Sequence, residues 1–396
     1  PVLPRFFYSR AFTLPLFYTA HLLLVRRLIR EHHIDIVHCR SYHAANLMRW
    51  AKRLLGVSCK LVFDPRSLFV DEGLLFGAFS EGSLHHKLWQ SAERALLAEA
   101  DRVVSVSDTL GQVLLERSPK ARIVTIPTST NTRIFRRSCD EQARRRALGL
   151  PAHAPTRAGL VTLASEHKVL VYLGNLEAKG WYSAEVLADV YRVFRATFGD
   201  TGLLVVTRAD REGLVRTLVA RGLLEGEIVI AKGERPEEVA GLLQSADYSV
   251  IPYGRVTTET ERRIAWTVIA SKTGEYLCSG LPVIVNETVG AASRLVTEHR
   301  VGCTFRLGEE NALAERLREM AADYPGMSRR CTELGLAYFD ARDHARKYLG
   351  IYHELLDRER LDPERLDRER LDRERLDREP KRPPLGGALD RASIQP

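Results

Sequence analysis

Lys272 and Glu275 stand one helical turn apart in the segment SKTGEYLCSGLPVIVN, residues 271–286. The pattern predicts a short helix that begins at Ser271 and stops at Gly280, ahead of a buried strand. Unpaired N–H groups and the positive end of the dipole make a helix N-terminus a natural seat for phosphate, and Lys272 adds a full positive charge there. Glu275 could accept hydrogen bonds from sugar or ribose hydroxyls. In the structural alternative, Ser271 is only an N-cap and the two charged side chains form an exposed pair at positions i and i+3.

Two further groups of residues follow predicted strands. Asp64 and Arg66 come directly after the strand at 59–63, where they could orient an acceptor or a donor sugar, and Glu72 is a weaker candidate. The loop at 253–270 leads from the end of another strand into the short helix described above. Ligands of open parallel sheets bind outside the carboxyl ends of the strands. We therefore expect both groups to face a ligand cleft, although a local salt bridge would equally explain Asp64 and Arg66.

Apolar runs and helical patterns alternate along the chain in two blocks. Near-continuous Val, Ile and Leu runs are typical of parallel strands that are buried on both faces. The predicted fold class is therefore α/β, with two Rossmann-like domains that face each other across a cleft. The predicted strands occupy residues 34–39, 59–63, 102–107, 122–127, 168–173, 202–207, 227–231, 247–252 and 281–285.

The expected domain bounds follow from this alternation and from changes in composition. The pentapeptide LDRER is repeated in the C-terminal part, and its i,i+4 Glu–Arg pairs predict a solvated helix without a catalytic role. The Pro-rich end of the chain is expected to be disordered. We expect an incomplete N-terminal Rossmann-like domain at 1–135, a linker at 136–166, a second Rossmann-like domain at 167–310, C-terminal helices at 311–356, the LDRER helix at 357–379 and the disordered tail at 380–396.

Composition indicates an ordinary globular protein of about two domains. The chain has 396 residues, of which 45% are hydrophobic and 28% are charged, so it can bury a large apolar core. Its six cysteines contain no CxxC pair, which argues against a disulfide framework or a zinc site and favours a reducing cytoplasm. No apolar run reaches the roughly 18 residues that a membrane-spanning helix needs.

Positive charge is concentrated at the beginning of the chain. Residues 1–60 contain ten Lys or Arg against Glu31 and Asp35, a surplus equal to the whole net charge of +8. Interleaved Phe and Leu side chains would suit an anionic membrane surface. The alternative is an amphipathic helix that packs on its own domain and leaves a solvated basic rim. No motif for reading nucleic acid accompanies the charge, so nucleic acid is not expected as a partner.

The segment around Lys272 closely resembles a motif of the family-4 glycosyltransferases, of the type S-x-T-K-x-x-E-Y-L-A-x-G-x-P-V, which Lys272, Glu275, Gly280 and Pro282 match. The stretches YLGNLEAKGWYS, ADRVVSVSDTL and IVTIPTSTNTRIF are similar to other segments of that family, and the resemblance spans about residues 30–350. It implies the GT-B fold, a nucleotide-diphosphate sugar as the donor, no metal or other cofactor, and transfer with retention of configuration.

The resemblance also implies roles for individual residues. Glu275 would contact the ribose of the donor and Lys272 its diphosphate, while Gly174 would let the backbone approach the donor. Asp64 and Arg66 would complete the catalytic set from the first, acceptor-side domain. The donor-binding set would comprise Gly174, Asn175, Lys179, Ser271, Lys272, Glu275 and Gly290.

Departures from the family pattern leave a second hypothesis open. Thr267 stands where many members carry the first of two glutamates, Asn175 where an arginine is usual and Asn131 where an aspartate is usual. The family's first strand and Gly-rich loop do not precede Pro1, so the sequence is expected to be either a fragment or the product of a gene that has lost its start. These departures favour a truncated, non-catalytic GT-B remnant that at most binds nucleotide. A sugar-nucleotide epimerase or a phosphorylase is a third alternative, for which no convincing set of acid and base residues is visible.

The main hypothesis is a retaining hexosyltransferase that moves a sugar from a nucleotide-diphosphate donor to a polysaccharide or lipid-linked acceptor in cell-envelope glycan synthesis. Its partners would be the nucleotide sugar, a glycan or glycolipid acceptor and, through the basic N-terminal segment, an anionic membrane. We expect it in the cytoplasm or bound peripherally to the cytoplasmic face of the membrane. The residues do not specify which sugar is transferred.

Overall fold

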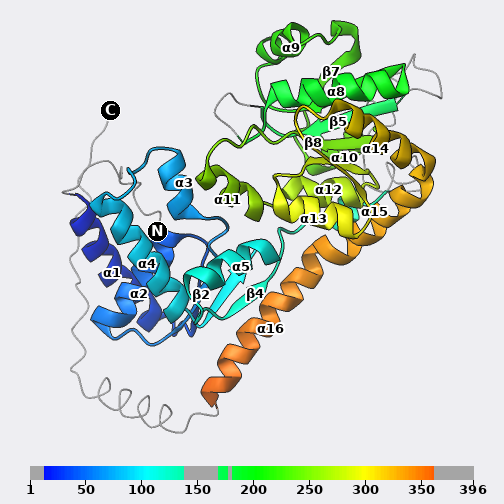
Figure 1. Ribbon diagram of the computed structural model, residues 1–396. Helices are drawn as coiled ribbons and strands as arrows, with labels where there is room; N and C mark the ends of the chain where they lie inside the picture. Colours follow the sequence, from blue (N-terminus) through cyan, green and yellow to red (C-terminus); the bar gives the residue numbers. More distant parts are fainter. Residues whose placement is uncertain (1–12, 138–167, 177–180, 361–396) are drawn as a thin grey trace, which may run out of the picture. The chain divides into compact units, whose positions relative to one another are not determined.

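The computed structural model describes residues 13–137, 168–176 and 181–360 (Figure 1). The larger of two compact units ends at Leu349, and α16 (Ala341–Arg360) continues into the smaller one. Four of the predicted features fall outside these residues in whole or in part. They are the linker beyond Arg137, the side chain of Lys179, the LDRER repeat beyond Arg360 and the tail at 380–396.

The first sheet has four parallel strands in the order β1-β2-β3-β4. The two inner strands consist almost entirely of buried residues, as their continuous apolar runs predict. The strands are β1 (Ile36–Cys39), β2 (Lys60–Phe63), β3 (Arg102–Ser105) and β4 (Ile123–Thr125).

The second sheet has six parallel strands in the order β10-β9-β8-β5-β6-β7. β5 lies in the middle and pairs with β6 on one side and with β8 on the other, so the strand order reverses between β5 and β8. In open α/β sheets this reversal marks where ligands bind. The strands are β5 (Lys168–Leu173), β6 (Thr201–Val206), β7 (Ile228–Ala231), β8 (Tyr248–Ile251), β9 (Val283–Asn286) and β10 (Gly302–Phe305).

Helices alternate with these strands and begin and end at the expected signals. α2 starts after Ser41, whose hydroxyl accepts a hydrogen bond from Ala44 N, and stops at Gly56, which adopts the left-handed conformation. The helices are α1 (Thr13–Glu31), α2 (Tyr42–Leu55), α3 (Phe69–Leu75), α4 (Leu84–Glu99), α5 (Asp108–Arg117), α6 (Thr132–Phe135), α8 (Ala184–Phe198), α9 (Arg211–Ala220), α10 (Pro236–Leu243), α11 (Glu259–Thr267), α12 (Ser271–Cys278), α13 (Gly290–Glu298), α14 (Glu310–Ala322), α15 (Tyr324–Phe339) and α16.

Three elements differ from the sequence interpretation. The segment at 253–270 is not a continuous loop, because α11 forms inside it, and α3 likewise interrupts the predicted loop after β2. β10 was not predicted at all. α11 carries a capping box in which Thr258 and Glu261 satisfy each other's backbone N–H groups. The spacing T-x-x-E is the sequence signal that could have revealed this helix.

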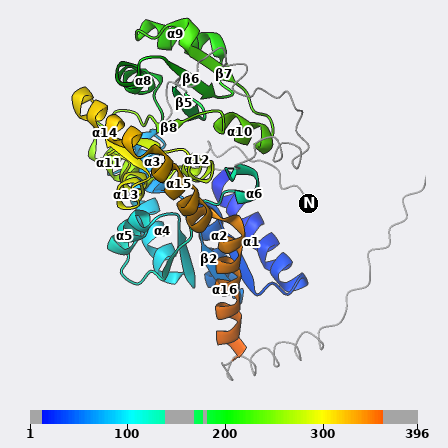
Figure 2. The same ribbon diagram turned by 90° about the vertical axis from the view of Figure 1, so that its right-hand side faces the viewer.

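The basic N-terminal segment forms α1, which packs along α2 (Figure 1 and Figure 2). His21 and Ile29 are buried, and Leu22 and Val25 pack against the core, as expected for an amphipathic helix on its own domain. Leu23 remains 56% exposed. Within the part of the chain that the structure describes, no helix is long and apolar enough to cross a membrane.

A buried network of charges lies where α3 meets α5 and α11. Arg117 donates to Glu93 and to Asp71, and Glu93 also accepts a hydrogen bond of 2.7 Å from Tyr42. Arg263 on α11 donates to the other oxygen of Asp71 at 3.1 Å. Removing one member of such a network would leave a buried charge without compensation. The network therefore ties the first turn of α3 to α11, the helix that follows β8.

Two glycines allow α12 to lie very close to its neighbours. A Cβ atom on Gly335 of α15 would come within 2.5 Å of the backbone of Cys278, and one on Gly274 within 2.8 Å of the Phe339 ring. Both positions are therefore closed to any larger residue. The contacts hold α12 between α15 and the chain that precedes α6, where Thr130 also touches Gly274.

We predict that Gly335→Ala destabilises the protein by about 1–3 kcal/mol, because the added methyl group must push α15 away from α12. Urea unfolding followed by circular dichroism measures the change. Gly350→Ala is a matched control, since Gly350 is also helical and a Cβ atom there meets nothing within 4 Å. The control should gain up to about 1 kcal/mol from helix propensity. Equal stability of the two variants would contradict the close packing of α12.

Candidate functional site

α12 begins at the edge of the sheet where β5 and β8 end. Ala270 is its N-cap and contributes no side-chain hydrogen bond, and Ser271 is exposed as the first helical residue. The alternative in which Ser271 is the N-cap is therefore wrong. The N-terminal N–H groups of α12 are left without a side-chain cap, which suits the binding of an anion.

Lys272 is buried, with only 7% of its surface exposed. Its ammonium donates to the hydroxyl of Tyr172 at 3.2 Å and lies 3.4 Å from the ring centre of Tyr182 and 4.6 Å from that of Tyr172. Burial lowers the pKa of Lys272 to about 7, and the nearby charge of Glu275 opposes this shift only in part. A buried cation held between two aromatic rings is not half of an exposed i,i+3 pair, so that part of the structural alternative is also wrong.

Glu275 follows one turn later and is half-buried. Burial raises the pKa of its carboxyl group, whereas the charge of Lys272 lowers it. No ion pair joins the two side chains among the residues that the structure describes. Neither charged side chain is therefore occupied by the other, and both are available to a ligand. Each shifts the pKa of the other through its electric field and not through direct contact.

Gly174 lies directly opposite Lys272, at the end of β5. Its φ angle is 135°, and a Cβ atom there would come within 2.8 Å of the Lys272 ammonium and 3.1 Å of the Tyr172 hydroxyl. Glycine is thus required for the backbone conformation and for access to the cation. Asn175, the next residue, is exposed, and its carbonyl accepts a hydrogen bond of 3.0 Å from Tyr172.

Gly290 starts α13 and is buried against the Trp266 ring, since a Cβ atom there would come within 2.3 Å of it. This contact explains the glycine through packing of α13 on α11. Its role in donor binding stays a prediction. Lys179 belongs to the residues that the structure does not describe.

Asp64 lies at the end of β2 and is completely buried. One carboxylate oxygen lies 3.4 Å from Arg66, 3.6 Å from Arg40 and 3.8 Å from His38. The other oxygen, Oδ1, is buried without a hydrogen-bond partner in the described parts of the chain. The salt bridge between Asp64 and Arg66 is therefore present, and it belongs to a larger cluster at the ends of β1 and β2.

Arg66 has a φ angle of 64°, a conformation that side chains other than glycine rarely adopt. Its guanidinium also donates to Thr128 Oγ1 at 3.3 Å. Strain of this kind is often found at functional sites. Arg40 and His38 were not among the predicted residues, although both sit in the run HCR that ends β1.

Glu72 lies on α3, where it accepts a hydrogen bond of 2.9 Å from Ser67, and burial raises its pKa. The positions that depart from the family pattern have structural roles. Thr267 is buried at the end of α11, and its carbonyl accepts a hydrogen bond of 2.8 Å from Ser107. Asn131 caps α6 through a hydrogen bond from Arg133 N, a role that an aspartate could also fill.

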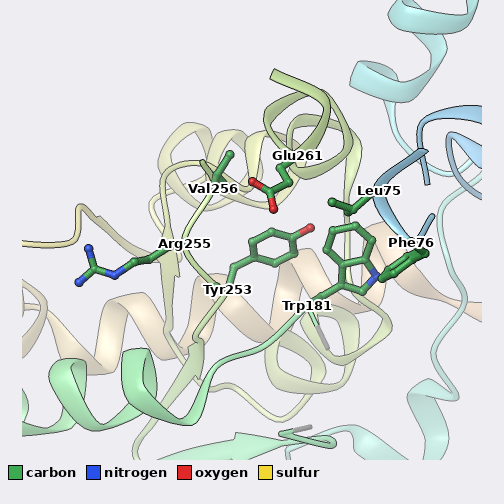
Figure 3. A pocket seen from close by; sticks show the side chains of 8 residues that line it. Leu75, Phe76, Trp181, Tyr253, Arg255, Val256 and Glu261 are labelled. Carbon is green, nitrogen blue, oxygen red and sulfur yellow. The ribbon is translucent and has the colours of Figure 1, made fainter. Parts of the chain in front are cut away.

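A cavity of about 380 Å³ opens beside the ends of β5 and β8 (Figure 3). Trp181 and Tyr253 stack with ring centres 5.7 Å apart, and Phe76 meets Trp181 edge to face at 5.4 Å. These aromatic residues were not among the predicted site residues. The cluster GWYS after β5 is the sequence signal that could have revealed Trp181.

Two family models match the chain. The model of Glycosyltransferase Family 4 matches residues 1–133, and that of Glycosyl transferases group 1 matches residues 167–323. No curated protein matches the chain.

Solved glycosyltransferase structures share the fold. Sucrose-phosphate synthase from Thermosynechococcus elongatus has a TM-score of 0.63 and 19% identity, over 88% of this chain and 81% of that one. A glycosyltransferase from Rickettsia africae has a TM-score of 0.64 and 15% identity, over 90% and 84% of the two chains. Anabaena HepE in complex with UDP has a TM-score of 0.61 and 13% identity, over 84% and 82%.

The two parallel α/β sheets and these likenesses define the GT-B fold of glycosyltransferases. The two matched models together extend over most of the chain, one for each sheet. The chain belongs to the family-4 glycosyltransferases, as its motifs predicted. Its class of activity is therefore sugar transfer.

We predict that diphosphate binding to this site takes up a proton. The pKa of free Lys272 is about 7, and a bound anion favours the charged ammonium, so the apparent affinity should fall by about tenfold between pH 7 and 8.5. Isothermal titration of a nucleoside diphosphate in buffers of different ionisation enthalpy measures both effects. Lys272→Met should bind weakly at every pH and take up no proton. A pH-independent affinity of the wild type would contradict the role of Lys272.

The lowered pKa of Lys272 also makes the stability of the unliganded protein depend on pH. Between pH 7 and the ordinary pKa of lysine, the unfolded chain holds a proton that the folded protein lacks. The contribution of Lys272 to the free energy of unfolding therefore rises with pH across this window. Lys272→Met should lose this contribution to the pH dependence, which urea unfolding at several pH values would show.

Proposed function

We propose that the chain is a retaining hexosyltransferase that moves a sugar from a nucleoside-diphosphate donor to a polysaccharide or lipid-linked acceptor in cell-envelope glycan synthesis. The observation that carries this proposal is the buried ammonium of Lys272 at the uncapped N-terminus of α12, opposite Gly174. A cation that is shielded from water and lies opposite a glycine without a side chain is suited to binding a diphosphate.

In the proposed reaction the bond between the sugar's anomeric carbon and the diphosphate oxygen breaks. The acceptor hydroxyl forms the new bond to that carbon, and its proton passes to the departing diphosphate oxygen. The nucleoside diphosphate leaves with the electron pair, and Lys272 together with the N–H groups of α12 stabilises its developing charge. Retention of configuration follows from the family resemblance.

Glu275 accepts hydrogen bonds from the ribose in this proposal, and Ser271 and Asn175 line the donor side. Two solved structures of Anabaena HepE contain UDP and UDP-glucose, which supports a nucleotide sugar as the donor. Among the described residues, no group of three His, Cys, Asp or Glu side chains could hold a metal ion. The proposed stabilisation by Lys272 and backbone N–H groups needs none.

The acceptor side of the proposal rests on the cluster of Asp64, Arg66 and Arg40 at the ends of β1 and β2. These groups could orient an acceptor hydroxyl or a phosphate attached to it. A phosphorylated sugar is present in the similar trehalose-phosphate synthase from Burkholderia xenovorans, whose structure contains glucose-6-phosphate.

The proposed membrane contact rests on α1. Exposed Leu23 lies one turn from exposed Arg27, and Arg30 follows on the same helix. An apolar side chain beside basic residues suits the surface of an anionic bilayer, where a lipid-linked acceptor would be found. We accordingly place the protein on the cytoplasmic face of the membrane.

We predict that a nucleoside diphosphate or its sugar raises the melting temperature of the wild type by several degrees, and that Glu275→Ala loses most of this shift because the ribose contact is gone. Thermal-shift screening of UDP, GDP, ADP and TDP with their common sugars measures it. Glu259→Ala, which changes an exposed glutamate of α11, is the control and should respond like the wild type.

Three outcomes of this screen separate the hypotheses. Stabilisation together with release of nucleoside diphosphate in the presence of an acceptor supports the enzyme. Stabilisation without turnover for any donor and acceptor tried favours the nucleotide-binding remnant, for which the buried, hydrogen-bonded Thr267 in place of a glutamate is the supporting observation. An equal response of wild type and Glu275→Ala contradicts the assignment of the site.

A further inference from the structure

The cavity beside β5 and β8 is a preformed space of about 380 Å³, within the size range of small-molecule sites. Two loop segments, residues 181–183 after β5 and residues 252–254 after β8, lie together beside it. Gly254 N donates to Trp181 O at 2.9 Å, Ser183 N donates to Pro252 O at 2.9 Å, and Tyr182 and Tyr253 form a β-bridge. Backbone hydrogen bonds therefore hold the two loops together without a ligand.

The walls of the cavity are mainly aromatic. Trp181 stacks on Tyr253 within the second sheet's loops, while Leu75 and Phe76 approach from the end of α3. Phe76 remains 59% exposed although it touches Trp181. Tyr253 belongs to the hydrophobic core and Trp181 packs against it, whereas Phe76 lines the cavity with most of its surface exposed. An exposed aromatic side chain at the mouth of an open cavity can offer its ring to a ligand.

The polar groups beside these rings are the oxygen atoms of a hydroxyl and a carboxylate. Tyr253 is 97% buried, and its hydroxyl has no hydrogen-bond partner among the described residues. In Figure 3 this hydroxyl and the Glu261 carboxylate lie close to Trp181 and Leu75, whereas Arg255 extends away from them. The negative charges of Glu72 and Glu261 also help to raise the pKa of Tyr253, after burial and Tyr182. The cavity is thus lined by the Tyr253 hydroxyl and by the Glu261 carboxylate, whose Oε2 already accepts hydrogen bonds from Thr257 and Thr258, while its basic residue points elsewhere.

The groups that line the cavity favour some classes of ligand over others. A buried, unpartnered hydroxyl is costly unless a ligand completes its hydrogen bonds. Carboxylates disfavour a phosphate and favour a donor of hydrogen bonds. Aromatic faces favour a ring with an apolar surface. A pyranose ring combines C–H faces with hydroxyl groups at its rim and meets all three requirements.

We infer that the cavity lined by Trp181, Tyr253 and Glu261 is a subsite for a pyranose ring of the acceptor. Its assignment to the acceptor rests on the proposed function. Tyr182 lies between the Lys272 ammonium and Tyr253, 3.4 Å from the ammonium and 6.0 Å from the Tyr253 ring. With the diphosphate at Lys272, the transferred sugar occupies the space next to it, and the cavity beyond Tyr182 receives the acceptor.

Saturation-transfer NMR on the full chain tests this site directly. The probes are the methyl pyranosides of glucose, galactose and mannose, with glycerol as a polyol without a ring face and cyclohexanol as a ring with one hydroxyl. We expect saturation of the C–H protons of at least one pyranoside in the millimolar range and none for glycerol or cyclohexanol. Absence of saturation for every pyranoside would overturn the proposal, as would equal binding of cyclohexanol.

Two variants with matched controls locate the binding. Trp181→Ala should weaken the responding pyranoside at least fivefold, while Trp50→Ala on α2 should not change it. Tyr253→Phe should weaken it about threefold because only the hydroxyl is lost. Tyr248→Phe removes another buried hydroxyl without a described partner, outside the cavity, and should have no effect. Unchanged binding in both Trp181→Ala and Tyr253→Phe would overturn the site.

The same samples separate this proposal from the proposed function. A thermal shift with nucleoside diphosphate that survives in Trp181→Ala shows that the variant is folded and that the donor site is distinct. Pyranoside binding that disappears on addition of nucleoside diphosphate would overturn the acceptor assignment, because the cavity would then belong to the donor. Pyranoside binding without any nucleotide response would sustain the carbohydrate site and contradict the proposed donor site.

Discussion

The close packing of α12 against α15 and the chain before α6 is the constraint on which the candidate site depends. α12 can approach α15 and the chain before α6 because Gly335 and Gly274 present no side chains at the contacts. In this position the first turn of α12 lies at the end of β5, and the Lys272 ammonium lies opposite Gly174. A helix displaced by one methyl group would move the ammonium relative to the open backbone opposite it, because packed interiors transmit such shifts.

The burial of Lys272 gives the site its chemical character. A cation removed from water is destabilised, and this burial lowers the pKa of Lys272 to about 7. The faces of Tyr172 and Tyr182 and one hydrogen bond to Tyr172 stabilise the charged form. A bound anionic ligand would favour the protonated, charged form of Lys272 and would itself compensate that charge. The folded protein therefore holds a group whose electrostatic state depends on what is bound, which is common at functional sites.

Contacts made by α3 connect the buried charge network of Asp71, Arg117 and Glu93 with α11 and with Trp181 after β5. Arg263 pairs with Asp71, which is itself held by buried Arg117, and Phe76 at the end of α3 meets Trp181. α3 thus contributes both to a charge network and to the wall of the cavity. Neither α3 nor α11 carries the motif that identifies the family, yet together they shape the space next to the candidate donor site.

Much of the fold followed from the sequence alone. Period and composition located nine of the strands, because runs of Val, Ile and Leu between turn signals are typical of strands in parallel sheets. The motif with Lys272 and Glu275 indicated the family and the donor side, and Gly174 was singled out before its positive φ was visible. These features are local: each depends on residues that lie near one another in the chain.

The tertiary structure alone decided how the site is built. Tyr172 and Lys272 are 100 positions apart, and Phe76 is even farther in sequence from Trp181, so no local pattern shows that they meet. The burial of Lys272, the partners of Asp64 and the unpartnered hydroxyl of Tyr253 all depend on which elements pack together. A pKa shift or a cavity is set by the atoms that exclude water, and those atoms come from segments that only the fold brings into contact.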